Sequence, residues 1–189
     1  CFGVKRAIKI AENTKNASTI GPLIHNNEEI NRLRENFNVK TLHDISEANG
    51  VDKAIIRTHG IPKNDLETLM KSDVQVINAT CPYVTKPQEI CEKMSSEGYE
   101  IVIFGDADHP EVKGVESYAI HGAHVIQRVD ELAEVKFKNS KIAVVSQTTR
   151  KVSEFLEITS YLITRYKEAR VFNTICNATF ENQDAAREL

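Results

Sequence analysis

Short runs of aliphatic and β-branched residues alternate along the chain with longer segments in which apolar residues recur every three or four positions. The short runs predict buried strands at residues 53–56, 74–77, 100–104, 125–128, 141–145 and 170–172. The longer segments predict helices at residues 4–16, 27–36, 62–72, 83–97 and 152–166. Strands that alternate with helices in this way are typical of an α/β fold with largely parallel strands.

Two segments of the chain are similar to each other. Residues 76–81 and 171–176 each consist of the end of a predicted strand, an Asn, two further residues and a Cys. A Gln followed by an acidic residue comes seven positions after each Cys, at Gln88 and Gln183. This weak repeat suggests that two lobes each present a thiol from the same kind of strand-to-helix turn.

Composition narrows the class of protein. The chain has 189 residues, of which 41% are hydrophobic and 27% charged, as in ordinary globular proteins. It carries 24 Lys plus Arg against 27 Asp plus Glu and has no basic stripe, so we expect no nucleic-acid partner. No apolar run has the length needed to cross a bilayer, so we expect no membrane association.

The cysteines and the two ends of the chain suggest where the protein works and how much of it is present. Four Cys without close pairing, in a chain with no export signal, are typical of a reducing cytoplasm. The chain begins at Cys1 without a Met and ends in a stretch with the composition of a helix, so we expect it to be a fragment.

Chemically distinctive residues follow the predicted strands, and parallel sheets bind ligands at the carboxyl ends of their strands. Cys1, Cys81 and Cys176 each stand beside a predicted helix start, where the helix dipole favours a thiolate. They are candidates for a metal or cluster site. The alternative is that these three cysteines simply pack in the core, as isolated cysteines usually do. The chain has no Cys-x-x-Cys pair, which would have favoured the metal site over this alternative. Cys91, inside a predicted helix, is assigned to packing.

Three loop histidines, His25, His59 and His109, form a second group. Imidazoles donate hydrogen bonds, and their cationic forms attract phosphate, so a cluster of them could bind an anion in an acidic protein. For any one of them, an ordinary surface or hydrogen-bonded role is the more common outcome. The anion-site interpretation therefore depends on the three lying together.

Glu111 and two threonines complete the candidates. In a pocket crowded by anions, the pKa of Glu111 would rise and the residue could donate a proton near neutrality; the alternative is a solvated Glu at a helix start. Thr148 and Thr149 could either cap the helix predicted at 152–166 or contact a ligand.

Seven motifs occur together in a fixed order. They are Cys-Phe-Gly-Val at 1–4, Ile-His-Asn at 24–26, Thr-His-Gly at 58–60, Asn-Ala-Thr-Cys-Pro at 78–82, His-Pro-Glu-Val-Lys-Gly at 109–114, Ser-Gln-Thr-Thr at 146–149 and Ile-Cys-Asn-Ala-Thr at 175–179. Each motif alone is weak, but their order is highly specific. Through them nearly the whole chain resembles the 4-hydroxy-3-methylbut-2-enyl diphosphate reductase family, also called the LytB family.

The resemblance implies a role for each candidate residue. It implies that a [4Fe-4S] cluster, with one iron free of protein ligands, is held at the centre of a three-lobed molecule by Cys1, Cys81 and Cys176. It implies that the diphosphate of the substrate is bound by His25, His59 and His109. It places Thr148 and Thr149 beside the substrate and gives Glu111 the role of proton donor.

The resemblance also implies the reaction. The allylic diphosphate substrate, (E)-4-hydroxy-3-methylbut-2-enyl diphosphate, would be converted to isopentenyl diphosphate and dimethylallyl diphosphate by two-electron reductive dehydroxylation. This is the last step of the non-mevalonate isoprenoid pathway. A ferredoxin or a flavodoxin would supply the electrons, and we expect a monomer.

Against the family's pattern, the chain lacks the short strand before the first Cys and the Ser-x-Asn motif of the third lobe. We therefore expect lobes at residues 1–81 and 82–172 and the start of a truncated third lobe at residues 173–189. An alternative of a different class stays open: a non-catalytic zinc- or phosphate-binding α/β protein in which the same Cys and His residues hold the lobes together.

Overall fold

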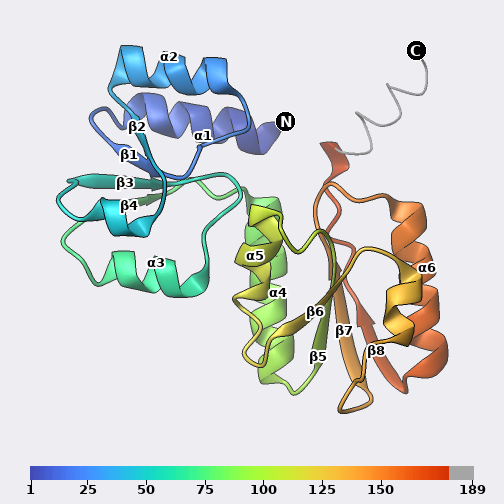
Figure 1. Ribbon diagram of the computed structural model, residues 1–189. Coiled ribbons are helices and arrows are strands. Elements are labelled where there is room, and N and C mark those ends of the chain that lie inside the picture. Colours follow the sequence, from blue (N-terminus) through green and yellow to red (C-terminus); the bar gives the residue numbers. More distant parts are fainter. Residues whose placement is uncertain (179–189) are drawn as a thin grey trace, which may run out of the picture. The chain divides into compact units, whose positions relative to one another are not determined.

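The structure is a computed structural model that describes residues 1–178. It divides into two compact units, the first spanning Cys1–Val84 and the second beginning at Thr85. Each unit contains one sheet of four parallel strands with helices on both faces (Figure 1). The predicted α/β fold with parallel sheets is confirmed.

The first unit is a three-layer arrangement. Its elements are α1 (Phe2–Asn13), β1 (Ser18–Ile20), α2 (Asn27–Phe37), β2 (Lys40–Leu42), the 3-10 helix η1 (Ile45–Ala48), β3 (Lys53–Ile56), α3 (Lys63–Met70) and β4 (Gln75–Asn78). The strand order is β2-β1-β3-β4. On β3, Ile55 packs with α1 and α2, while Ile56 packs with η1 and α3, so both faces of the sheet are buried.

The second unit repeats this plan. Its elements are α4 (Pro82–Ser96), whose first residues belong to the first unit, β5 (Glu100–Phe104), α5 (Pro110–Glu116), β6 (Ala123–Ile126), the 3-10 helix η2 (Val129–Ala133), β7 (Lys141–Ser146), α6 (Val152–Arg165) and β8 (Glu168–Val171). The strand order, β6-β5-β7-β8, is equivalent to that of the first sheet. Ile103 packs under α4 and α5, and Phe104 packs under α6 and η2.

The sequence predicts the bounds best for strands that are mostly apolar and buried. The bounds of β3 and β5 are as predicted, because each strand is a run of apolar residues that follows one charged residue. β6 begins two residues earlier than predicted, at Ala123, and β8 begins two residues earlier, at Glu168. Five short elements were not predicted: the three-residue strands β1 and β2, the helix α5, and the 3-10 helices η1 and η2.

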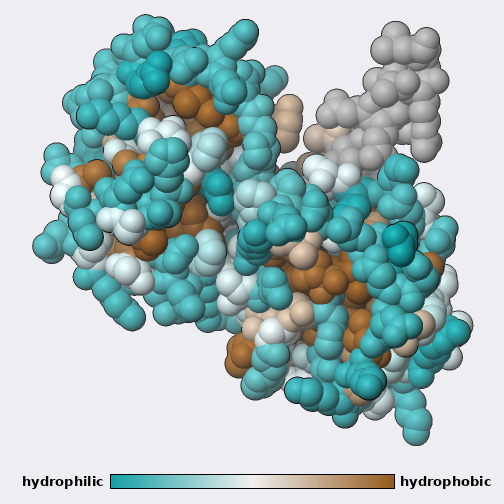
Figure 2. Space-filling view, viewed as in Figure 1, coloured by the Kyte–Doolittle hydropathy of each residue, from teal (hydrophilic) through white to brown (hydrophobic). Residues whose placement is uncertain are grey.

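Hydrophilic residues cover most of the face shown in Figure 2. Within residues 1–178, no helix combines the length and the apolar character needed to cross a membrane. Most of the predicted third lobe, residues 179–189, lies outside the described residues, and the lobe boundaries at 81 and 172 stay predictions.

Candidate active site

His25 and His59 come together at the carboxyl ends of two neighbouring strands of the first unit. β1 and β3 pair in parallel, and the loops that follow them carry the two histidines. The buried Thr58 joins these loops, because its backbone N–H and its hydroxyl both donate to the carbonyl oxygen of Leu23, at 3.2 and 3.0 Å. The two imidazole rings lie with their centroids 4.5 Å apart. Two of the three histidines predicted to lie together are therefore neighbours, whereas the third, His109, belongs to the second unit, so the three-histidine cluster stays a prediction.

Arg57 adds a positive charge at the same edge of the sheet. Its Nε donates to the carbonyl oxygen of Gly60 at 3.2 Å, and the N–H of Gly60 donates back to the carbonyl oxygen of Arg57 at 3.0 Å, which closes the turn that carries His59. Partial burial lowers the pKa of the Arg57 guanidinium. Sequence reasoning singled out only His59 in this loop; the signal it missed was an Arg directly after a buried strand.

Cys81 is held in a turn between β4 and α4. Its N–H donates to the carbonyl oxygen of Thr58 at 2.9 Å, and the side-chain oxygen of Asn78 accepts from the N–H of Thr80 at 2.9 Å. Cys1 stands at the N-cap of α1, as predicted from its place beside a helix start. The first turn of α1 also reaches Cys81, since a Cβ on Gly3 would lie only 2.5 Å from the Cys81 Sγ.

Glu111 is buried in the second unit, with only 2% of its surface exposed. Its two carboxyl oxygens accept hydrogen bonds from the N–H and the hydroxyl of Thr148, both at 2.7 Å. Burial raises the pKa of the Glu111 carboxyl, and the hydrogen bonds from Thr148 oppose this rise. The alternative of a solvated Glu at a helix start is therefore wrong. The proton-donor interpretation requires a raised pKa, and the pKa of Glu111 is raised.

His109 stands next to Glu111 at the start of α5. Its Nδ1 accepts a hydrogen bond from the N–H of Glu111 at 3.1 Å. A ring nitrogen that accepts cannot carry a hydrogen, so a neutral His109 carries its hydrogen on Nε2 and can donate from there. The start of α5 thus carries the buried acid Glu111, and the backbone N–H of Glu111 determines the tautomer of a neutral His109.

Thr148 also holds the backbone of Cys176, the third candidate metal ligand. Its carbonyl oxygen accepts from the N–H of Cys176 at 2.9 Å, just as Thr58 accepts from Cys81 in the first unit. Asn173 accepts from the N–H of Ile175 at 3.2 Å, as Asn78 does from the residue two positions later. The Asn-x-x-Cys repeat in the sequence therefore corresponds to a repeated turn, in which the Asn side chain closes the turn and a Thr carbonyl anchors the Cys.

Thr149 and Thr148 do not cap α6. The N-cap of this helix is Lys151, with no side-chain hydrogen bond, so that alternative is wrong. The Thr149 hydroxyl instead accepts from Gln147 Nε2 at 3.2 Å, within the loop after β7.

The candidate residues divide between the two units. Cys1, Cys81, His25 and His59 belong to the first, and Cys176, His109, Glu111, Thr148 and Thr149 belong to the second. Among the described residues, no three His, Cys, Asp or Glu side chains are grouped closely enough to hold a metal ion. Convergence of the three thiols on one centre therefore stays a prediction.

Solvent exposure distinguishes three of the cysteines from the fourth. Cys1 is exposed, while Cys81 and Cys176 are partly exposed. Cys91 is fully buried on α4, and burial raises the pKa of its thiol to about 12, which disfavours the thiolate that metals bind. Its assignment to packing is confirmed, and the other three thiols fit a metal centre by their accessibility and donor type.

Comparison with known proteins decides the family. The family model described as the LytB protein matches residues 1–189, which is the whole chain. The chain belongs to the LytB protein family. The family assignment made from the seven motifs is confirmed.

Curated relatives of this LytB chain carry the name of one enzyme, 4-hydroxy-3-methylbut-2-enyl diphosphate reductase. The protein of that name from Campylobacter concisus is 67% identical over 189 residues, which are 100% of this chain and 69% of the relative. Those from Campylobacter fetus and Campylobacter jejuni are 68% and 65% identical, and the chain covers 67% and 68% of their lengths. The LytB chain thus has reductases as its relatives, as the sequence predicts.

Solved structures similar to this chain are reductases too. A structure of (E)-4-hydroxy-3-methyl-but-2-enyl diphosphate reductase, described as the terminal enzyme of the non-mevalonate pathway, superposes with a TM-score of 0.84 at 37% identity. The match covers 100% of this chain and 69% of that one. A reductase structure from Plasmodium falciparum gives a TM-score of 0.90 at 26% identity and is covered over 62% of its length.

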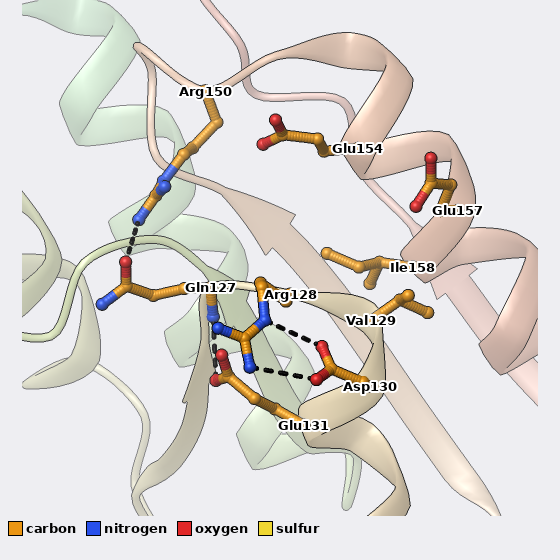
Figure 3. Close-up of a pocket in the computed structure, with 9 residues that line it drawn as sticks. All are labelled: Gln127, Arg128, Val129, Asp130, Glu131, Arg150, Glu154, Glu157 and Ile158. Atoms are coloured by element: carbon orange, nitrogen blue, oxygen red, sulfur yellow. Dashed lines mark hydrogen bonds and ion pairs between the residues drawn. The ribbon is translucent and has the colours of Figure 1, made fainter.

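The LytB chain also has a hollow of about 640 Å³ between η2 and α6 that contains none of the candidate residues (Figure 3). Inside it, Arg128 forms two hydrogen bonds of 3.0 Å with Asp130, and Arg150 donates to Gln127 at 3.3 Å. The charge of Arg128 is thus matched by its neighbour, and we assign no role in the reaction to this hollow.

Proposed function

We propose that the chain catalyses the reductive removal of the hydroxyl group from (E)-4-hydroxy-3-methylbut-2-enyl diphosphate. Two electrons and two protons convert the substrate to isopentenyl diphosphate or dimethylallyl diphosphate and one molecule of water. The observation that carries this proposal is the buried Glu111 with a raised pKa, in a chain whose curated relatives have this enzyme's name. A carboxyl with a raised pKa holds its proton to a higher pH than an ordinary one, and the departure of a hydroxyl group needs such a proton donor.

Glu111 supplies one of the two protons. The carbon–oxygen bond of the allylic alcohol breaks, the carboxyl proton goes to the departing oxygen, and the oxygen leaves as water. The oxygen keeps the electron pair of that bond, and the two electrons from the external reductant pass to the allylic carbon skeleton, which takes the second proton. Thr148 holds both carboxyl oxygens of Glu111, so the acid is oriented before the substrate arrives.

The histidines bind the diphosphate. His25 and His59 lie together in one unit, and His109 has an Nε2 donor in the other. Hydrogen bonds to a charged group are about twice as strong as those between neutral groups, and protonation of a histidine beside phosphate strengthens them further. Thr149 lies in the same loop as Thr148, and both contact the substrate in this proposal.

The residues that would hold the cofactor are Cys1, Cys81 and Cys176, as ligands of a [4Fe-4S] cluster. When bound, such a cluster supplies electrons one at a time and a Lewis-acidic iron. A ferredoxin or a flavodoxin would deliver the electrons to a monomer. The cytoplasm is the expected compartment, because thiols remain reduced there.

Anaerobic analysis of the full-length protein tests the proposal. We expect four iron and four sulfide per chain, a brown colour, and consumption of the allylic diphosphate with a chemical reductant. Cys176→Ser should lose both cluster and activity, whereas Cys91→Ala, the matched control, should keep both. A colourless protein that holds zinc, or one that binds diphosphates equally well without iron, would contradict the proposal and favour the non-catalytic alternative.

A further inference from the structure

The first two turns of α1 contact the turn that presents Cys81. Gly3 lies directly against the thiol, since a Cβ on this residue would be 2.5 Å from Cys81 Sγ and 3.0 Å from Cys81 Cβ. The absence of a side chain at this helical position is therefore what lets the helix approach. A glycine inside a helix weakens it relative to alanine, so its presence here needs a reason such as this close approach.

Arg6, one turn further along α1, binds the same turn through its guanidinium. Nη1 donates to the carbonyl oxygen of Thr80 at 3.1 Å, and Nη2 is 3.4 Å from the carbonyl oxygen of Asn78. The two carbonyls flank Ala79, which is fully buried. A planar guanidinium can satisfy two acceptors at once, which a lysine ammonium on a flexible stem does less well.

The backbone of Cys81 makes two further hydrogen bonds within the first unit. Its N–H donates to the carbonyl oxygen of Thr58, as described above, and its carbonyl accepts from the N–H of Val84 at 2.8 Å. The backbone of this cysteine is thus fixed by the β3–α3 loop and by α4, while Arg6 and Gly3 fix the turn against α1. Because Cys1 is the N-cap of α1, the same contacts set where that cysteine lies relative to Cys81.

We propose that Arg6 and Gly3 are positioning residues for the metal centre, which hold the Cys1 end of α1 in register with the Cys81 turn. The inference rests on the proposed cluster and adds two residues that do not ligate it. Residues that orient metal ligands affect affinity strongly, because a ligand displaced by a fraction of an ångström no longer meets the metal at its preferred geometry.

Arg6→Met in the full-length protein tests the role of the guanidinium. Lys9→Met is the matched control, because it removes one positive charge from an exposed position of the same helix. Under anaerobic conditions with an iron chelator, we expect Arg6→Met to lose its visible absorption about 10- to 100-fold faster than the wild type. Arg6→Lys should be intermediate, and Lys9→Met should match the wild type.

Gly3→Ala gives a second test that does not depend on Arg6. Alanine forms helix better than glycine, so the helix itself should not be weakened, and any loss must come from the displaced thiol. We expect faster cluster loss in this variant too. In the metal-free protein, we expect an altered rate of Cys81 alkylation by iodoacetamide with an unchanged rate at Cys176.

The outcomes separate this inference from the proposed function. A wild-type protein that binds no iron would contradict the proposed function and this inference with it. A wild-type protein that holds its cluster while Arg6→Met and Gly3→Ala hold theirs equally well would overturn this inference alone. If Arg6→Met fails to fold, the rates of cluster loss and thiol alkylation in Gly3→Ala decide the question.

Discussion

Thr148 binds Glu111 twice, through its backbone N–H and through its hydroxyl, and each hydrogen bond is 2.7 Å long. The carbonyl of the same threonine accepts from the N–H of Cys176. One residue of the loop after β7 therefore fixes both the buried acid and the turn that carries a candidate metal ligand. A disturbance at Thr148 should reach both.

Glu111→Gln should separate proton donation from binding. Glutamine is close to glutamate in shape and keeps an acceptor for Thr148, but it has no acidic proton. We expect turnover to fall by about two orders of magnitude or more, as for loss of a positioned acid, while the iron content and substrate affinity stay near those of the wild type. Steady-state kinetics with anaerobic iron analysis measure this. Unchanged turnover would remove Glu111 from the proposed role.

The raised pKa of Glu111 predicts a pH-dependent stability. Because burial raises this pKa in the folded state, the folded protein prefers the protonated form. The stability that this form contributes is present below the unfolded pKa, about 4.3 for Glu, and is lost as the pH rises through the folded pKa. We expect the free energy of unfolding of the wild type to fall across this window relative to that of Glu111→Gln.

Chemical denaturation at a series of pH values measures this difference. Glu134→Gln is the control, because Glu134 is an exposed acid in the same unit. Parallel stability curves for the wild type and Glu111→Gln would show that the Glu111 pKa is not raised.

Thr148→Val should destabilise the second unit. Valine keeps the backbone hydrogen bond but removes the hydroxyl, which leaves a buried carboxyl oxygen without that partner. We expect a loss of about 1–3 kcal/mol in the free energy of unfolding. The pKa of Glu111 should rise further, because a hydrogen bond that lowers it is removed. Thr148→Ser keeps the hydroxyl and should stay closer to the wild type; equal losses in the two variants would argue against the hydrogen bond as the cause.

Thiol alkylation should divide the four cysteines of the metal-free protein. Iodoacetamide reacts with thiolates, and burial of Cys91 raises its pKa to about 12. We expect peptide mass spectrometry to find Cys1, Cys81 and Cys176 modified in the folded protein and Cys91 modified only after denaturation. Early modification of Cys91 would show that α4 opens readily.

The paired histidines should control substrate affinity. His59→Ala removes one hydrogen bond to the charged diphosphate, and such bonds contribute about 1.5–3 kcal/mol. That corresponds to an increase of about 10- to 100-fold in the KM, since each 1.4 kcal/mol is about tenfold. His121→Ala, at an exposed position outside the candidate site, is the control. A KM that rises equally in both variants would contradict a specific role for His59.

The sequence predicts best where one local signal is enough. β3 and β5 are each a run of apolar residues that follows one charged residue, so their bounds are predicted as observed. The strands β1 and β2 have three residues each, too few for a pattern, and depend on pairing with their neighbours. Their existence is decided by tertiary contacts, which periodicity does not report.

In the candidate site, too, the sequence predicts what a local signal indicates and misses what tertiary contacts decide. Its residues could be located because they follow strands, and the rule that ligands bind at strand ends needs only the order of elements. The hydrogen bonds between Glu111 and Thr148 join residues 37 positions apart, and no local pattern indicates them. Burial of Glu111 therefore could not be separated from the solvated alternative before the structure was known.

The repeated turn has a consequence for assembly. Each unit anchors its cysteine with its own threonine carbonyl, Thr58 for Cys81 and Thr148 for Cys176. The hydrogen bonds that position these two cysteines are therefore local to each unit. For the proposed cluster, this means that each unit brings a cysteine turn that is positioned by a hydrogen bond of its own.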